Sequence, residues 1–133
     1  MNLLLDTHVW IWSQETPERI GEQARQEILR SDRAIYVSTI STLEIARLAT
    51  IGLIELKGPL DLWVRESLEA LQGTAIEISH QISMGAYQLP GDFHKDPADR
   101  LIVATAREHD LTLVTADHRI QLYQSVDTLD AEK

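Results

Sequence analysis

The chain has 133 residues, of which 44% are hydrophobic, and a formal net charge of −9 at pH 7. This length fits one compact domain with its own core, and we assign residues 1–133 to it. The absence of cysteine excludes a disulfide framework, a zinc ribbon and thiol catalysis. Without a secretory signal or an apolar run near the roughly 20 residues that span a bilayer, we expect a cytoplasmic protein.

The acidic charge does not by itself define the partner. Affinity for nucleic acid normally comes from Lys and Arg, so a charge of −9 argues against such a ligand. Carboxylates that surround a bound cation, however, do not present bare negative charge to a substrate. The composition therefore leaves open a metal, a basic partner or a nucleic acid.

The first part of the chain alternates between β-rich and helix-forming segments. Hydrophobic pattern and start and stop residues predict, in order, a strand over 2–5, helices from Thr7 and from Pro17, a strand over 34–38, and helices from Ser41 to Gly52 and from Pro59 to Gly73.

The second part continues this alternation. It predicts a strand over 74–78, a helix over 79–89, a helix from Pro97, a strand over 111–115, a helical turn over 120–123 and an edge strand over 126–129. Such alternation is typical of an α/β fold, here a three-layer α/β/α sandwich with a central, mainly parallel sheet. Ligands of such sheets bind beyond the carboxyl ends of the strands.

Four acidic residues fall at the strand-to-helix junctions of this plan: Asp6, Glu44, Asp99 and Asp117. If the sheet is parallel, all four lie at one edge of it. Asp96 lies one helical turn further out.

Each acid taken alone also has a structural interpretation. Ser41 and Glu44 have the spacing of a capping box, and Asp96 and Asp99 suit a helix N-terminus, each worth about 1 kcal/mol. Capping, however, accepts Ser, Thr or Asn as readily as a carboxylate. Several carboxylates in one cleft repel one another unless a cation binds, and an all-oxygen site suits Mg²⁺ or Mn²⁺.

Four segments appear in an order and spacing that span nearly the whole chain: residues 3–8 (LLLDTH), 38–45 (STISTLEI), 96–106 (DPADRLIVATA) and 113–117 (LVTAD). In these segments the sequence resembles the PIN-domain ribonucleases, most closely the VapC-like toxins of bacterial and archaeal type II toxin–antitoxin pairs. The resemblance places the family's acidic quartet on Asp6, Glu44, Asp99 and Asp117, with Asp96 and Thr115 as accessory residues.

The resemblance implies an endoribonuclease that leaves 5′-phosphate and 3′-hydroxyl ends. Asp6, Asp99 and Asp117 would ligate one or two Mg²⁺ or Mn²⁺ ions, and Glu44 would ligate a metal or orient the attacking water. It also implies a homodimer held inactive by a cognate antitoxin, whose basic segment would suit a charge of −9. Which RNA is cut is not encoded in these motifs.

Rival functions remain at this point. A catalytically silent PIN-fold interaction module would keep the acids as caps alone. A phosphate-accepting signalling domain would need paired acids after the first strand and a Lys after the last, and an Asp-dependent phosphatase would need a second Asp two places after Asp6. The residues that follow Asp6, Thr7 and His8, argue against the last two.

Several other side chains have a functional and a structural interpretation. His8, His94 and His118 lie near the proposed edge, where a surface hydrogen-bonding role is the commoner one. Arg100 could contact phosphate or pair with a neighbouring acid. Trp63 could pack in the core or, with neighbouring leucines, form a groove for an antitoxin helix.

Overall fold

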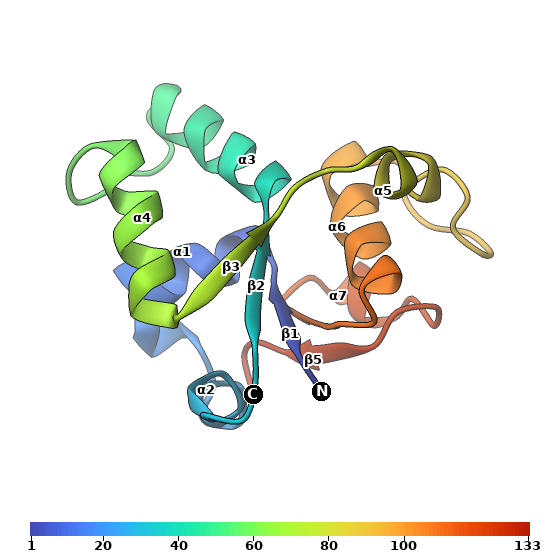
Figure 1. The fold of residues 1–133 in the computed structure, drawn as a ribbon, viewed down its shortest axis with the longest axis horizontal. Helices are drawn as coiled ribbons and strands as arrows, with labels where there is room; N and C mark the ends of the chain where they lie inside the picture. Colours follow the sequence, from blue (N-terminus) through green and yellow to red (C-terminus); the bar gives the residue numbers. More distant parts are fainter.

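The computed structural model describes residues 1–133 as a five-stranded sheet with helices on both faces (Figure 1). The strands are β1 (Leu3–Leu5), β2 (Ile35–Ser38), β3 (Gly73–Ile76), β4 (Thr112–Thr115) and β5 (Thr128–Asp130). The helices are α1 (Thr7–Glu15), α2 (Glu22–Leu29), α3 (Thr39–Thr50), α4 (Leu60–Leu71), α5 (His80–Gly85), α6 (Pro97–Glu108) and α7 (His118–Gln121), with a 3₁₀ turn, η1 (Pro17–Arg19). No helix is both long and apolar enough to cross a membrane.

The sheet is wholly parallel, in the order β3-β2-β1-β4-β5. The predicted α/β sandwich with a parallel sheet is therefore confirmed. β1 lies at the centre, with β2 on one side and β4 on the other, and Leu5 pairs with Val114. The chain runs from β1 to β2 and β3 on one side, and then returns to β4 and β5 on the other side of β1. This change of direction leaves a crevice at the carboxyl ends of β1 and β4.

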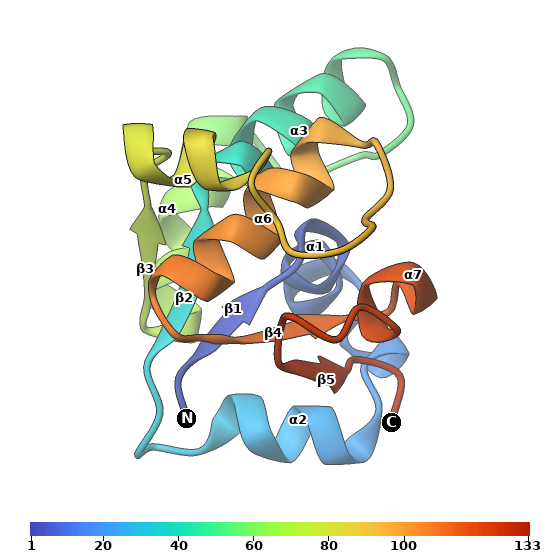
Figure 2. The same ribbon diagram turned by 90° about the vertical axis from the view of Figure 1, so that its right-hand side faces the viewer.

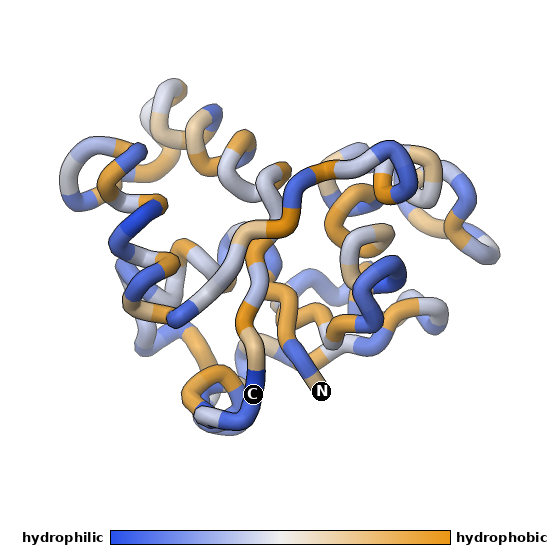
Figure 3. The backbone as a smooth tube through the Cα atoms, viewed as in Figure 1, coloured by the Kyte–Doolittle hydropathy of each residue, from blue (hydrophilic) through white to orange (hydrophobic).

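The core lies on both faces of β1, whose three leucines are fully buried. Leu3 and Leu5 face a cluster with Trp10 and Val37, while Leu4 faces the cluster that packs under α6. Successive strand residues point to opposite faces, so an unbroken apolar run suits a strand covered on both sides. Figure 3 shows hydrophobic positions following the central strands between the two helical layers.

The helix expected from Pro17 is interrupted. Residues 17–19 form η1, and α2 begins only after Gly21, whose backbone is extended and whose N–H donates to the Ala131 carbonyl at 2.9 Å. A Cβ atom at Gly21 would lie 2.3 Å from the backbone of Lys133, so only glycine permits this approach of the C-terminal segment. A tertiary contact, not visible in the local pattern, ends the helical run.

The helix expected from Ser41 begins two residues earlier, at Thr39. Ser38 is the N-cap of α3, and its hydroxyl accepts from the Ile40 N–H at 3.1 Å. The capping-box interpretation of Ser41 and Glu44 is therefore wrong, because both lie inside the helix and are free to face other elements. The helix expected over 79–89 is also shorter, since α5 covers only His80–Gly85.

Trp63 belongs to the hydrophobic core. Its side chain is 5% exposed, its ring centroid lies 5.3 Å from that of Trp10, and its Nε1–H donates to Glu15 Oε2 at 3.1 Å. The packing interpretation is confirmed, and the antitoxin groove with neighbouring leucines stays a prediction.

Candidate active site

The predicted acidic residues meet in one cleft at the carboxyl edge of the sheet, of about 400 Å³. Asp6 follows β1, Asp117 follows β4, and Asp99 lies in the first turn of α6. The lining of this cleft includes all four acids of the expected quartet together with Asp96, and also Thr7, His8, Trp12 and Arg119. The chain thus brings together side chains from positions 6 to 119.

One backbone N–H and one side-chain hydroxyl hold Asp6. One of its carboxylate oxygens accepts from the Thr7 N–H at 2.9 Å, as the N-cap of α1, and the other accepts from the Thr115 hydroxyl at 2.6 Å. The Thr115 oxygen also accepts from the Asp117 N–H at 3.0 Å. Thr115 therefore links the Asp6 carboxylate to the backbone of Asp117.

Glu44 is held in a similar way from a neighbouring helix. Its Oε1 accepts from the Thr7 hydroxyl at 2.6 Å, and that hydroxyl lies 2.8 Å from the Ser41 hydroxyl. Thr7 thus bonds to Asp6 through its backbone and to Glu44 through its side chain. Sequence reasoning missed Thr7, although its place directly after Asp6 at a strand end was a usable signal.

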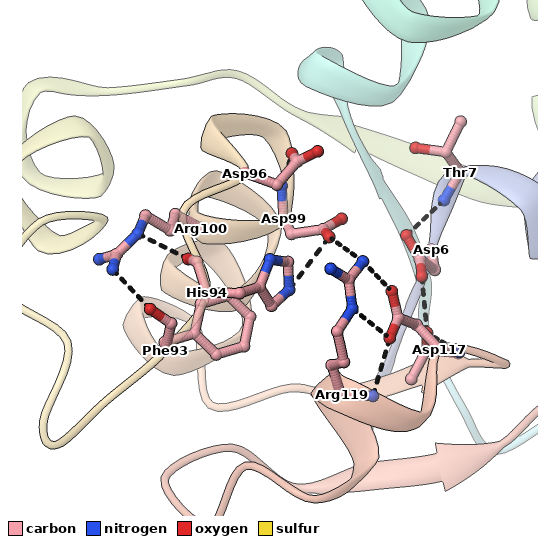
Figure 4. Close-up of polar contacts among 10 residues, drawn as sticks. Asp6, Thr7, Phe93, His94, Asp96, Asp99, Arg100, Asp117 and Arg119 are labelled. Atoms are coloured by element: carbon pink, nitrogen blue, oxygen red, sulfur yellow. Dashed lines mark hydrogen bonds and ion pairs between the residues drawn. The ribbon is translucent and has the colours of Figure 1, made fainter.

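Asp96 and Asp99 approach the cleft from the start of α6 (Figure 4). Asp96 caps the helix, with its Oδ1 accepting from the Asp99 N–H at 3.1 Å. Asp99 Oδ2 lies 3.2 Å from His94 Nε2 and 3.8 Å from an Arg119 nitrogen. His94 is therefore half-buried and faces the acidic cluster.

Asp117 caps α7 and pairs with Arg119. Its Oδ1 accepts from the Arg119 N–H at 2.8 Å, and the guanidinium lies 3.2 Å from Oδ2. Figure 4 shows Arg119 lying between Asp117 and Asp99. Sequence reasoning missed Arg119, whose only signal was its position two residues after Asp117.

Arg100 neither pairs with an acid nor faces the cleft. Its guanidinium donates to the backbone carbonyls of Ala86, Phe93 and His94 at 2.8–3.0 Å. Both sequence interpretations of Arg100 are therefore wrong, and its role is to hold the loop that carries His94.

A comparison with known families fits this geometry. The family model for the PIN domain matches residues 3–125. The chain belongs to the PIN-domain family. The chain is 38% identical over 122 residues to Ribonuclease VapC22 from Mycobacterium tuberculosis, covering 92% of each protein. The resemblance to VapC-like proteins is thereby confirmed.

Solved structures share the same PIN fold. VapBC2 from Rickettsia felis, bound to a DNA fragment from its promoter, aligns with a TM-score of 0.71 at 18% identity over 97% of this chain and 98% of that one. A toxin–antitoxin complex from Klebsiella pneumoniae aligns with a TM-score of 0.63 at 20% identity over 98% of both chains.

The electrostatics of this PIN-domain cleft favour a bound cation. Burial raises the pKa of Asp6 and of Glu44. Burial, reinforced by the charges of Asp6, Asp96, Asp117 and Glu44, raises the pKa of Asp99 to about 7. These carboxylates repel one another when ionised, and a divalent cation between them removes that cost.

The charge of Arg119 affects the other side of the cleft. Burial alone would raise the pKa of Asp117, but the hydrogen bonds and charge of Arg119 outweigh it and hold that pKa below its ordinary value. Burial, together with the charge of Arg119, lowers the pKa of His94, which favours the neutral imidazole. Neutral imidazole is the form that ligates metals.

The donor set fits a divalent metal. One ligand atom each of His94, Asp99 and Asp117 lie within 4.8 Å of one another, and Asp6 and Glu44 line the same cleft. Carboxylate oxygens suit Mg²⁺ or Mn²⁺. The sequence predicted an all-oxygen site, and the structure adds an imidazole nitrogen beside it.

Proposed function

We propose that this PIN-domain protein is a metal-dependent endoribonuclease that cleaves RNA phosphodiester bonds to 5′-phosphate and 3′-hydroxyl ends, and that it is the toxin of a type II toxin–antitoxin pair. The observation that carries this proposal is the convergence of Asp6, Glu44, Asp99 and Asp117 in one cleft. The relative VapC22 is named a ribonuclease, and its similarity extends over 92% of this chain.

In this proposal Asp6, Asp99 and Asp117 hold Mg²⁺ or Mn²⁺, with Asp96 as an accessory acid at the mouth of the cleft. The metal would lower the pKa of a bound water and neutralise charge on the phosphate. The protein supplies the placement: Thr115 and the Thr7 N–H fix both oxygens of Asp6, so the carboxylate is oriented before substrate binds.

In this proposal Glu44 ligates a metal or orients the attacking water. Its raised pKa makes it a better proton acceptor than an exposed glutamate, and only one of its oxygens bonds to Thr7. The second oxygen is left to accept a hydrogen bond from a water in the cleft.

The proposed partner is a cognate antitoxin with a basic segment. A net charge of −9 and an acidic cleft complement such a segment, and the structural relative from Klebsiella pneumoniae is a toxin–antitoxin complex. We also propose a homodimer. Pull-down with the product of the adjacent gene, followed by light scattering, tests both statements.

The function is tested by incubating a mixed RNA pool with wild type, Asp6→Asn and Asp99→Asn, each with Mg²⁺, Mn²⁺ or EDTA. Asp61→Asn is the matched control, because Asp61 is an exposed acid in the first turn of α4. We expect metal-dependent cutting by wild type and the control, and none by the two cleft variants. Cutting that survives EDTA or both substitutions would contradict the proposal. Absence of both cutting and metal binding would favour a catalytically silent interaction module.

A further inference from the structure

A second cavity of about 450 Å³ opens beside the acidic cleft. Arg119 lines both cavities, and His94, which contacts Asp99, lines the second one. Its wall includes Phe93, Leu122, Tyr123 and Gln124 and one acid, Asp92, but none of the acidic quartet. We name this cavity the aromatic groove. Its residues come from the 90–94 loop and from α7 and the segment after it.

We propose that the aromatic groove binds one nucleotide of a single-stranded RNA, adjacent to the phosphate in the acidic cleft. In this arrangement Arg119 contacts the backbone phosphate between the two sites, and the base lies in the groove. The inference rests on the proposed ribonuclease function and adds a substrate-binding site to it.

The surface of the groove suits a flat, partly apolar ligand. The Phe93 ring lies 4.3 Å from the His94 ring and 4.8 Å from the Tyr123 ring, centroid to centroid. The neighbouring Leu122 side chain is 81% exposed, an unusual position for a large apolar group beside a charged cleft. Proteins commonly bind unpaired RNA bases by stacking on aromatic side chains and by apolar contact.

The groove is held in place by hydrogen bonds that do not depend on a ligand. Arg100 donates to the carbonyls of Phe93 and His94, and the Tyr123 hydroxyl donates to the Pro90 carbonyl. The 90–94 loop is therefore tied to α6 and to the segment after α7. A preformed groove loses little conformational entropy when a base enters it.

Arg119 is suited to exchange its partners for phosphate. Its side chain is 64% exposed, and its contacts with Asp117 and Asp99 are 3.2 and 3.8 Å. Exposed ion pairs of this kind are weak, whereas a guanidinium binds phosphate through two parallel hydrogen bonds. A metal bound by the same carboxylates would compete for them and release Arg119 toward the substrate.

The test measures the affinity of a fluorescein-labelled eight-nucleotide RNA of mixed sequence by anisotropy, with Mg²⁺ and on the Asp6→Asn background to prevent cleavage. Apolar contact to a base is lost in Leu122→Ala, so we expect its Kd to rise by roughly fivefold. Arg119→Ala removes one phosphate contact and should lower the slope of log affinity against log salt by about 0.7.

Matched controls lie on α2, which Figure 2 shows below β5, with β4 and β5 between it and α6. Leu29 is an exposed leucine, and Arg25 is an exposed arginine 3.7 Å from Glu22. Leu29→Ala and Arg25→Ala should leave both Kd and salt slope close to those of the background. Equal effects of groove and control substitutions would overturn the proposal.

Photocrosslinking of wild type to the same RNA carrying 4-thiouridine locates the base directly. We expect adducts in peptides that contain residues 90–94 or 119–125, and adducts confined to other segments would overturn the proposal. If groove substitutions weaken only an antitoxin complex, the groove is a protein interface and not a nucleotide site. If wild type cuts RNA in a metal-dependent way and Leu122→Ala and Arg119→Ala cut it equally well, the groove is not a nucleotide site. The proposed ribonuclease function would remain intact.

Discussion

The two sides of the acidic cleft are built differently. On the side of Asp6 and Glu44, neutral threonine hydroxyls contact the carboxylates at 2.6 Å, and the Thr7 and Thr115 side chains are buried. On the side of Asp99 and Asp117, the neighbours are ionisable groups, one of them a largely exposed arginine.

We call the side of Asp6 and Glu44 the fixed side, and the side of Asp99 and Asp117 the adjustable side. Short hydrogen bonds from buried hydroxyls hold a carboxylate in one orientation, which prepares it for a metal without later rearrangement. Exposed ion pairs exchange easily with ligands. We therefore expect the fixed side to set the geometry of catalysis, and the adjustable side to respond to metal, pH and RNA.

The largest expected effect is on the rate of RNA cleavage, and it should be equally large for substitutions on the two sides of the cleft. Asp6→Asn and Asp117→Asn each remove a metal-binding charge, and we expect kcat to fall by roughly 10²–10³-fold in either variant. Single-turnover cleavage of an identified RNA measures this loss. Activity that survives Asp117→Asn but not Asp6→Asn would mean that Asp117 does not hold the metal.

A smaller effect should distinguish the fixed side from the rest of the core. Thr115→Val keeps the shape but removes the hydroxyl that bonds to Asp6, so we expect activity to fall by about 10–100-fold. Thr105→Val is the matched control, because Thr105 is equally buried but donates to the Leu101 carbonyl. Circular dichroism should show both variants folded, and equal activities would refute the role of Thr115.

The stability of the protein should depend on pH through the carboxyl groups of the adjustable side. The pKa of Asp99 is raised to about 7 in the folded protein, so the native state binds its proton more tightly than the unfolded chain does. This contribution to stability is full below the ordinary aspartate pKa and is lost as pH rises through 7.

In EDTA, we therefore expect the Tm of wild type to fall relative to that of Asp99→Asn between about pH 4 and pH 7. Asp117 should behave in the opposite way, because its pKa is lowered and its stabilisation is lost as pH falls. Thermal unfolding of wild type, Asp99→Asn and Asp117→Asn measures the two signs, between about pH 4 and pH 7 for Asp99 and below about pH 4 for Asp117. Parallel curves for wild type and Asp99→Asn would contradict the assignment.

The smallest effect concerns the choice of metal. His94 adds a nitrogen donor beside Asp99, and imidazole binds transition-metal ions better than Mg²⁺. His94→Asn should weaken Mn²⁺ binding by a few-fold and leave Mg²⁺ binding nearly unchanged, as measured by calorimetry. An equal loss for both ions would show that His94 acts on the shape of the cleft and not as a ligand.

The sequence was most informative about acidic residues that lie at the ends of strands and the starts of helices. Asp6, Asp99 and Asp117 could be placed at one edge because strand and helix boundaries follow from local patterns, and parallel strands end on the same side. The same reasoning predicted the layers and the parallel sheet.

Other features depend on contacts between distant segments. The start of α2 is set by the approach of the C-terminal segment to Gly21, and the bond from Thr7 to Glu44 joins residues 37 positions apart. Arg119 and His94 lie in loops or short turns without periodicity, so no local pattern shows that they face the acids. Arg100 bonds to backbone carbonyls, which a sequence motif cannot show.

The central claim is that carboxylates from both sides form one metal site, and calorimetric titration with Mn²⁺ tests it most directly. Wild type and Asp61→Asn should bind with the same affinity, while Asp6→Asn from the fixed side and Asp99→Asn from the adjustable side should each weaken binding by about tenfold or more. Unchanged affinity in either cleft variant, or absence of binding by wild type, would contradict a shared metal site.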